Sequence, residues 1–258
     1  VSVTFIPESK VASQQSPEDC ISVHAPAGGH TIGFNSSASL AVHTSMFSRA
    51  LAAMIQEHSS GNDFLLISPK GEGKTILAQE FAAALGYGTP HLFAMNTEMT
   101  SHDLLVRRST DQSTGETGWE DSPLLRAARQ GGICVLDGVE KLRPDVLSSI
   151  QSLILDRDIA LPDGRRVLRN DRINPSNTPI HEDSIVTVHP SFRIIALATL
   201  PRGDDGNRWI TPNLMASFSA IHLPPLTEDC LRAILEHHAS SEASNSDIES
   251  SLALREQL

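Results

Sequence analysis

Eight consecutive residues in the first third of the chain have the types and spacing that suit phosphate binding. They match the pattern G-x-x-x-x-G-K-[ST], with serine replacing glycine at the first position, and read Ser68-Pro69-Lys70-Gly71-Glu72-Gly73-Lys74-Thr75. Glycines permit positive φ angles, so that consecutive backbone N–H groups can curl around a phosphate. Lys74 would bridge the β- and γ-phosphates, and the Thr75 hydroxyl would ligate Mg²⁺. The loop therefore predicts a site for Mg-ATP, and the alternative is an ordinary turn between a strand and a helix.

The residues on either side of this loop favour phosphate binding over a simple turn. Residues 64–67 form a continuous apolar run, which is typical of a buried strand. After the loop, apolar residues recur at helical spacing, namely Ile76, Leu77, Phe81, Ala84 and Leu85. A strand, a glycine-rich loop and a helix in this order place the phosphates at a helix N-terminus, whose partial positive charge attracts anions.

Asp137 is a second candidate ligand for the metal. It follows the apolar run at residues 133–136, which predicts another buried strand. A carboxylate at the carboxyl end of a strand beside a phosphate loop can hold Mg²⁺ or its water. The alternative is an aspartate that caps the next helix. Given the phosphate loop, we expect the metal site to comprise Thr75 and Asp137.

Strand and helix patterns alternate along most of the chain. Further strands are predicted at residues 92–95, 192–197 and 221–223, and further helices at residues 123–129, from Pro144 onward and at residues 228–238. Strands that alternate with helices connect into parallel units, and helices then cover both faces of the sheet. We expect an α/β fold with an irregular, partly stranded lead-in at residues 1–40, a core at 41–224 and a loosely ordered tail within 225–258.

The pair Asp163-Gly164 predicts a hairpin between short strands at residues 159–161 and 166–168. This pair is preferred in tight turns because both residues tolerate positive φ. We expect a two-stranded projection from the core that serves contact with a neighbour or substrate and that folding does not require.

Composition limits the classes of function. The chain has 258 residues, is 40% hydrophobic and carries a formal net charge of −11, which repels nucleic acid unless a basic stripe is present. No such stripe is found, and the apolar runs are too short to span a membrane.

Three distant cysteines indicate neither disulfides nor zinc, so we expect a soluble protein of a reducing, intracellular compartment. Because the sequence begins with Val1, we expect a processed chain or a piece of a longer one.

Several segments give the chain a family resemblance over roughly residues 47–226. It resembles the MoxR, midasin and dynein-related group of AAA+ ATPases, and the segments that carry the resemblance are Asp103-Leu104-Leu105, Gly118-Trp119-Glu120-Asp121-Ser122-Pro123-Leu124, Gly131-Gly132-Ile133-Cys134-Val135-Leu136-Asp137, Leu161-Pro162-Asp163-Gly164-Arg165 and His189-Pro190-Ser191-Phe192-Arg193. Within that group it is most similar to an AAA module of the mitochondrial von Willebrand factor A domain-containing protein eight family. The resemblance implies a five-stranded P-loop NTPase core, other AAA+ modules as partners in a ring, a protein substrate or adaptor, and a helical lid. Only the start of that lid, near Glu228, is present.

The chain also departs from the hydrolysing members of this group. They carry Asp-Glu where this chain has Asp137-Gly138, so the carboxylate that would activate water is missing. Thr199 stands at the position of their sensor asparagine, and Met215 and Ser217 stand where arginines are usual. Glu140, two residues beyond Gly138, is a weak candidate for a substitute catalytic base, and a solvated or capping role is the alternative.

Two main hypotheses of function follow. The chain is either an ATP-binding AAA+ module whose own hydrolysis is weak or absent, or a fully active AAA+ ATPase motor domain. A small-molecule kinase or a GTPase is disfavoured, because the chain has no guanine-reading N-K-x-D motif.

Overall fold

The structure is a computed structural model that describes residues 2–5, 21–25, 27–28, 42, 44–110, 115–173, 184–201 and 212–239. Much of the predicted lead-in and the tail beyond residue 239 lie outside the described residues. Within the lead-in, the strands β1 (Ser2–Phe5) and β2 (Ile21–His24) form an antiparallel pair. The limits set at residues 40 and 224 between lead-in, core and final segment stay a prediction.

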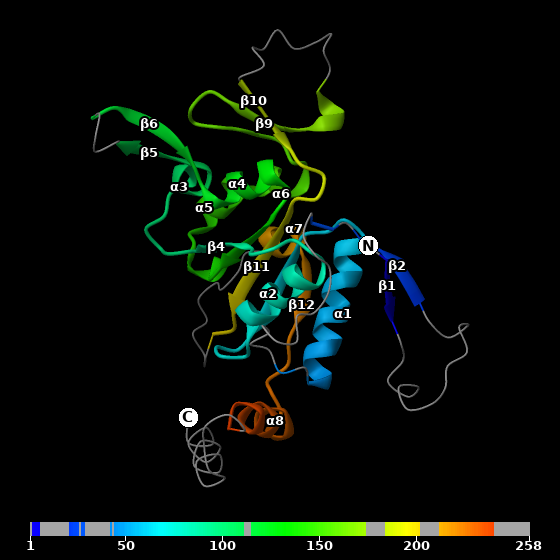
Figure 1. The fold of residues 1–258 in the computed structure, drawn as a ribbon. Coiled ribbons are helices and arrows are strands. Elements are labelled where there is room, and N and C mark those ends of the chain that lie inside the picture. Colours follow the sequence, from blue (N-terminus) through cyan, green and yellow to red (C-terminus); the bar gives the residue numbers. More distant parts are fainter. Residues whose placement is uncertain are drawn as a thin grey trace.

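A five-stranded parallel sheet forms the centre of the molecule (Figure 1). Its strands, in spatial order, are β12 (Ser219–His222), β3 (Phe64–Ser68), β11 (Arg193–Thr199), β7 (Ile133–Asp137) and β4 (His91–Ala94). Every neighbouring pair is parallel, which confirms the predicted fold class. The predicted strands are correct to within one to two residues at their ends.

Helices cover both faces of the parallel sheet, which explains why its three central strands, β3, β11 and β7, are continuous apolar runs. On one face, Phe64 and Leu66 of β3 pack in a core with α1 (Ser45–Ser59) and α2 (Lys74–Ala84). On the other face, Leu65 and Ile67 pack in a core with helices from the middle of the chain, namely α4 (Pro123–Gln130), α5 (Pro144–Ser149) and α6 (Gln151–Leu155). The alternation of side chains along each strand therefore divides one apolar run between two cores.

Local signals fix where the helices begin. Thr44 caps α1 by accepting a hydrogen bond from the Phe47 amide at 3.2 Å, and Ser122 caps α4 in the same way, with Pro123 in the first turn. The predicted helix from Pro144 is broken at Ile150 into α5 and α6. The remaining helices are α3 (Ser101–Leu105), α7 (Pro212–Ser217), α8 (Glu228–Ala239) and the 3₁₀ turns η3 (Val139–Lys141) and η4 (Asn170–Arg172). No helix in the described ranges is long and apolar enough to cross a membrane.

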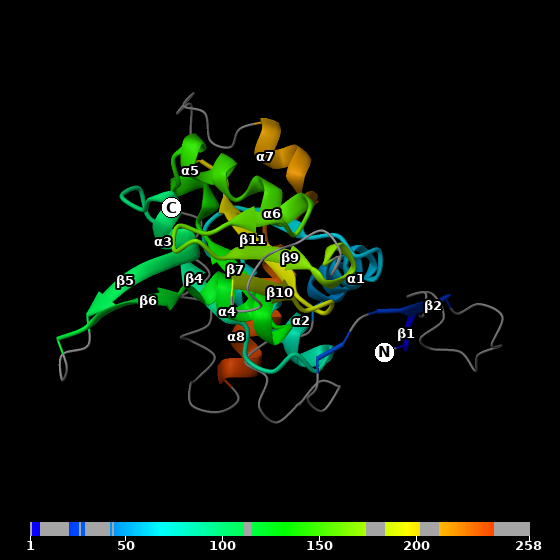
Figure 2. The same cartoon turned by 90° about the horizontal axis from the view of Figure 1, so that it is seen from above.

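Two smaller sheets lie at the end of the molecule opposite α8 (Figure 1). The antiparallel pair β5 (Val106–Thr110) and β6 (Thr117–Asp121) was not foreseen, and it extends away from the rest of the molecule on the side opposite β1 and β2 (Figure 2). The predicted hairpin is present as β8 (Ile159–Ala160) and β9 (Arg166–Arg169). However, β10 (Ile185–Val188) pairs in parallel with β9, so the prediction of two strands is wrong.

The turn of this hairpin also differs from the prediction. Gly164 has a positive φ of 91°. Asp163 does not have a positive φ; among the non-glycine residues that the structure describes, only Arg157 does. The Gly164 amide donates to the Leu161 carbonyl at 3.1 Å, so the turn spans residues 161–164 and begins one residue earlier than a turn centred on Asp163-Gly164. Leu161 and Val167 are buried in the main core, and this burial argues against the expectation that folding does not require the hairpin.

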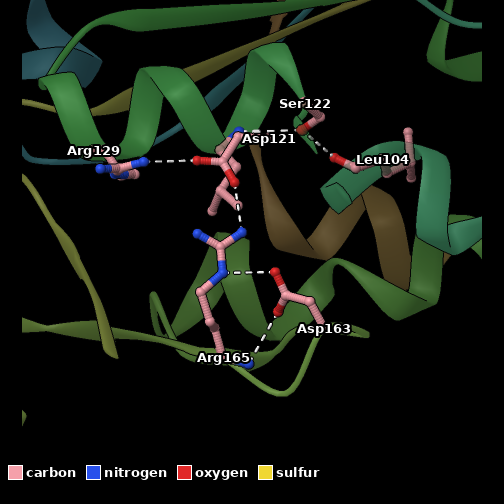
Figure 3. Close-up of polar contacts among 7 residues, drawn as sticks. Leu104, Asp121, Ser122, Arg129, Asp163 and Arg165 are labelled. Carbon is pink, nitrogen blue, oxygen red and sulfur yellow. Dashed lines mark hydrogen bonds and ion pairs between the residues drawn. The ribbon is translucent and has the colours of Figure 1, made fainter. Parts of the chain in front are cut away.

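A chain of ion pairs joins the two smaller sheets (Figure 3). Asp121, at the end of β6, accepts hydrogen bonds from Arg129 of α4 at 2.8 Å and from Arg165 of the β8–β9 hairpin at 2.6 Å. Arg165 also contacts Asp163 at 2.6 Å. Burial raises the pKa of the Asp121 carboxyl, but the hydrogen bonds from both arginines outweigh burial, so that its pKa lies below the ordinary value. Asp121 therefore fixes the base of one hairpin to the other.

We predict that Asp121→Asn lowers the free energy of unfolding at pH 7 by about 1–2 kcal/mol, since a neutral amide replaces a carboxylate bonded to two guanidinium groups. Folding lowers the pKa of this carboxyl, so its contribution is complete above the ordinary value of 3.8 and is lost as the pH falls through the lower folded value. Denaturant unfolding at pH 7 and pH 3 should show the difference between wild type and variant shrinking in acid. Asp145→Asn, at an exposed ion pair, should change little at either pH. A difference for Asp121→Asn that is equal at both pH values would contradict this account.

Candidate nucleotide-binding site

The glycine- and lysine-containing loop connects β3 to α2 at the carboxyl edge of the central sheet. Strand β3 lies between β12 and β11, and β11 separates it from β7, which ends at Asp137. In an open parallel sheet, ligands bind at this edge, where the loops after neighbouring strands meet. The fold therefore brings the phosphate loop and Asp137, which are 62 or more residues apart in sequence, to one edge of the sheet.

The backbone of the loop requires its glycines. Gly71 and Gly73 have φ angles of +89° and +78°, in the left-handed region that side chains disfavour. A Cβ atom built on either residue would meet no atom within 4 Å, so the requirement lies in the backbone conformation and not in packing. Gly73 also serves as the N-cap of α2 without any side-chain bond. The loop thus presents bare backbone at a helix N-terminus, which suits an anion.

Lys74 is held inside this loop. Its side chain is buried, and its ammonium donates to the Ser68 carbonyl at 3.1 Å, the Ser68 hydroxyl at 3.0 Å and the Pro69 carbonyl at 2.9 Å. Burial lowers the pKa of Lys74, and the nearby carboxylates of Glu140, Asp137 and Glu72 oppose that shift. Serine at the first loop position is therefore more than a tolerated replacement for glycine, because its hydroxyl contributes one of the three acceptors that position the lysine.

Backbone pairing places Asp137 and Thr199 close to the loop. Thr199 at the end of β11 pairs with Ser68 of β3, and two residues earlier Leu197 pairs with Asp137 of β7. The carbonyl of Asp137 accepts from the Met95 amide at 2.8 Å, which joins this position to the end of β4. Asp137 therefore lies at the same edge of the sheet as the loop that contains Thr75, and the metal-binding role of these two residues stays a prediction.

The Glu140 carboxylate acts on Lys74 of the phosphate loop, which its sequence position did not indicate. It belongs to η3, directly after Asp137 and Gly138, and its charge acts on the Lys74 ammonium. Its Oε2 atom is buried and has no hydrogen-bond partner among the described residues. A buried carboxylate oxygen without a donor is costly, and such an atom is usually satisfied by water, an ion or a ligand. The two carboxylates and Lys74 therefore form one electrostatic group that fits a magnesium-bound phosphate.

The positions that depart from hydrolysing relatives are also constrained by the structure. Gly138 has a φ of +83°, and a Cβ there would lie 3.1 Å from Cε and Nζ of Lys141, so glutamate would be strained at this position. Ser217 is buried and accepts a hydrogen bond from Gln151 at 3.1 Å. Met215 packs partly against the main core. Neither side chain is exposed.

Sequence reasoning missed an apolar crevice beside the loop. It has a volume of about 140 Å³ and lies between α1, the start of α2 and α8, with Phe47, Ile76, Leu223 and Ile234 among its walls. Glu72 of the loop accepts a hydrogen bond from the Leu226 amide at 2.8 Å, which ties the loop to the segment before α8. The sequence predicted only a strand at residues 221–223 and a helix at residues 228–238, because the periodicity of one element does not show which elements meet.

Comparison with known proteins shows the family. Residues 63–218 match the AAA domain of the dynein-related subfamily, so the chain belongs to this family of AAA+ proteins. It is 36% identical to mouse von Willebrand factor A domain-containing protein 8 over 216 residues, which are 81% of this chain and 11% of that protein. It is 33% identical to the protein NorQ of Paracoccus denitrificans over 53% of this chain and 52% of NorQ. The predicted family resemblance is confirmed, and the chain spans from about a tenth to about half of these relatives.

A solved structure supports the same fold. NtrX from Brucella abortus, in complex with ADP, superimposes with a TM-score of 0.52 at 18% identity, over 78% of this chain and 41% of that one.

We predict that Lys74→Ala weakens Mg-ATP binding by at least tenfold, because it removes the buried ammonium that the loop holds for the phosphates. Lys70→Ala is the matched control, since it removes the same charge from an exposed position of the same loop and should weaken binding much less. Isothermal titration with both variants measures the difference. Equal affinities of Lys74→Ala and wild type would exclude the assigned site.

Proposed function

We propose that this chain is a Mg-ATP-binding AAA+ module of a larger ring-forming ATPase, and that its own hydrolysis of ATP is weak. The observation that carries the proposal is the placement of Lys74, which three acceptors hold in a glycine-shaped loop beside Asp137 and Glu140. In this assignment, residues 68–75 hold the phosphates, Thr75 and Asp137 hold Mg²⁺, and the bound metal supplies positive charge at the phosphates. The apolar crevice beside α8 would take the base.

Weak hydrolysis follows from groups that the chain lacks. Gly138 provides no carboxylate, and a missing general base typically costs about 10²–10⁴ in rate. Met215 and Ser217 provide no arginine finger, which is worth about 10³–10⁵. Such losses in rate are not additive. If the logarithm of the actual loss is half the sum of the two separate logarithms, roughly 3–6 kcal/mol of transition-state stabilisation is missing. Binding of the ground state does not depend on these groups.

Glu140 favours a second candidate, an active ATPase. Its buried Oε2 atom has no donor among the described residues and lies within electrostatic reach of Lys74. A carboxylate in this position could accept a proton from the attacking water. In hydrolysing members of the family, the glutamate at the position of Gly138 would have this role. This second candidate requires that Glu140 acts as a base, whereas the first requires only that it interacts with the bound magnesium and its waters.

The wider setting of the module belongs to the same proposal. Membership of an AAA family supports other AAA+ modules as ring partners. A protein substrate or adaptor and a mitochondrial location are proposed from the resemblance to the von Willebrand factor A domain-containing protein eight family. Because the chain spans 11% of the mouse protein, these partners concern a larger assembly than the segment described.

Single-turnover hydrolysis of bound ATP by wild type and Glu140→Gln separates the two candidates. We predict a slow wild-type rate that Glu140→Gln changes by less than about tenfold, since no base is removed. Asp145→Asn, an exposed change of the same charge, controls for general electrostatic effects. A fast wild-type rate that falls by about 10²–10⁴ in Glu140→Gln, with ATP affinity preserved, would establish Glu140 as the base and refute weak hydrolysis.

A further inference from the structure

A second pocket lies at the edge of the central sheet opposite the phosphate loop. It has a volume of about 740 Å³ and is formed where three parallel strands begin, at Asp63 before β3, at Phe192 and Arg193 at the start of β11, and at Phe218 and Ser219 at the start of β12. The loops at this edge do not reach the nucleotide site, which lies at the carboxyl ends of the same strands. The pocket is therefore separate from the proposed ATP site.

The buried acidic residue in the pocket wall, Asp63, is neutralised by an arginine. The side chain of Asp63 is 2% exposed and forms a two-bond ion pair with Arg157, at 2.6 and 2.8 Å. The second oxygen atom also accepts from the Ile194 amide at 2.9 Å. Arg157 holds a left-handed backbone, with φ of 56°, and donates to the carbonyls of Leu153 and Ile154 as well. One carboxylate and one guanidinium thus satisfy each other.

A second guanidinium in the wall has no such partner. Arg193 is 9% exposed, and its Nη1 atom donates to the carbonyls of Pro190 and Phe192 at 3.1 and 2.7 Å. Neither its buried Nε atom nor its Nη2 atom donates to any residue that the structure describes. Burial lowers the pKa of Arg193, yet a guanidinium remains protonated at neutral pH. At the rim, Arg169 and Asp171 pair at 2.9 Å and cancel each other. The Asp63 carboxylate also acts on Arg193, so the described lining residues together have an excess of one positive charge.

A buried charge without a counterion is strongly unfavourable, so a negative ligand would gain most of its affinity from Arg193. One unmatched charge fits a monoanion, since a dianion would place excess negative charge beside Asp63 and Asp171. The remaining wall is mixed: the side chains of Asn62, Asn170 and Ser219 are polar, and those of Leu155 and Ala216 are apolar and exposed. A pocket of this size lies in the range of about 300–1,000 Å³ that small-molecule sites occupy.

We propose that this pocket binds a small organic carboxylate, whose carboxylate group pairs with Arg193 and whose apolar body lies against the exposed apolar part of the wall at Leu155 and Ala216. Nothing in this site depends on the nucleotide, so it is a second ligand site of the module.

Benzoate and acetate are suitable probes, because both are monoanions and only benzoate has an apolar body. We expect the thermal midpoint of the chain to rise by about 5–10 °C in benzoate at about 100 times its Kd, relative to sodium chloride of equal ionic strength. Acetate should bind at least tenfold more weakly than benzoate. Arg193→Met should abolish the benzoate effect, whereas Arg166→Gln, which changes an exposed arginine outside the pocket, should preserve it.

A second variant keeps the test decisive if Arg193→Met does not fold. Ala216 is exposed and lines the pocket, so Ala216→Trp should fill the pocket, leave the midpoint in sodium chloride nearly unchanged and remove the benzoate effect. Absence of any benzoate effect in wild type would overturn the proposal, as would a benzoate effect that survives in Ala216→Trp. Measurement in the presence and absence of Mg-ADP should give the same result, since the ATP site is not involved.

Discussion

The parallel pairing of β3, β11 and β7 is the constraint on which the rest of the structure depends. These three strands are buried on both faces, and their register places Ser68 beside Thr199 and Asp137 beside Leu197. Because parallel strands all end at the same edge, the loop that begins at Ser68 and the carboxylate at Asp137 must lie near each other. The same rule places Asp63, Arg193 and Ser219 together at the opposite edge. One sheet thus creates two separate polar sites.

The chemistry proposed for the first site rests on a contrast between binding and turnover. Groups that bind a phosphate in its ground state are present: a left-handed glycine loop, a buried ammonium and nearby carboxylates. Groups that act only in the transition state are absent or displaced, and the left-handed backbone at Gly138 disfavours the usual glutamate there. Glu140 is the residue that could alter this balance. Its carboxylate is close enough to Lys74 to oppose the lowering of the lysine pKa by burial. A catalytic base must also contact the attacking water.

Sequence patterns were sufficient for the elements whose signals are local. The apolar runs of β3, β7 and β11 and the helix expected at residues 123–129 predicted the observed structure closely. Signals that depend on distant partners were not readable. The β5–β6 pair carries mostly polar, exposed residues and is fixed by Asp121 to an arginine 44 residues away. The burial of Leu161 and Val167, the bonds from Lys74 to Ser68 and the isolated charge of Arg193 likewise follow from packing between elements.

The affinity of the isolated wild-type chain for Mg-ATP, measured beside the rate at which bound ATP becomes ADP, tests the central claim most directly. We predict tight, magnesium-dependent binding of ATP, together with a rate of ATP hydrolysis close to the uncatalysed rate in water. Binding that is absent would contradict the assigned phosphate loop. Binding followed by rapid, repeated turnover at high dilution, where no neighbouring module can assist, would contradict the view that this module holds ATP without hydrolysing it.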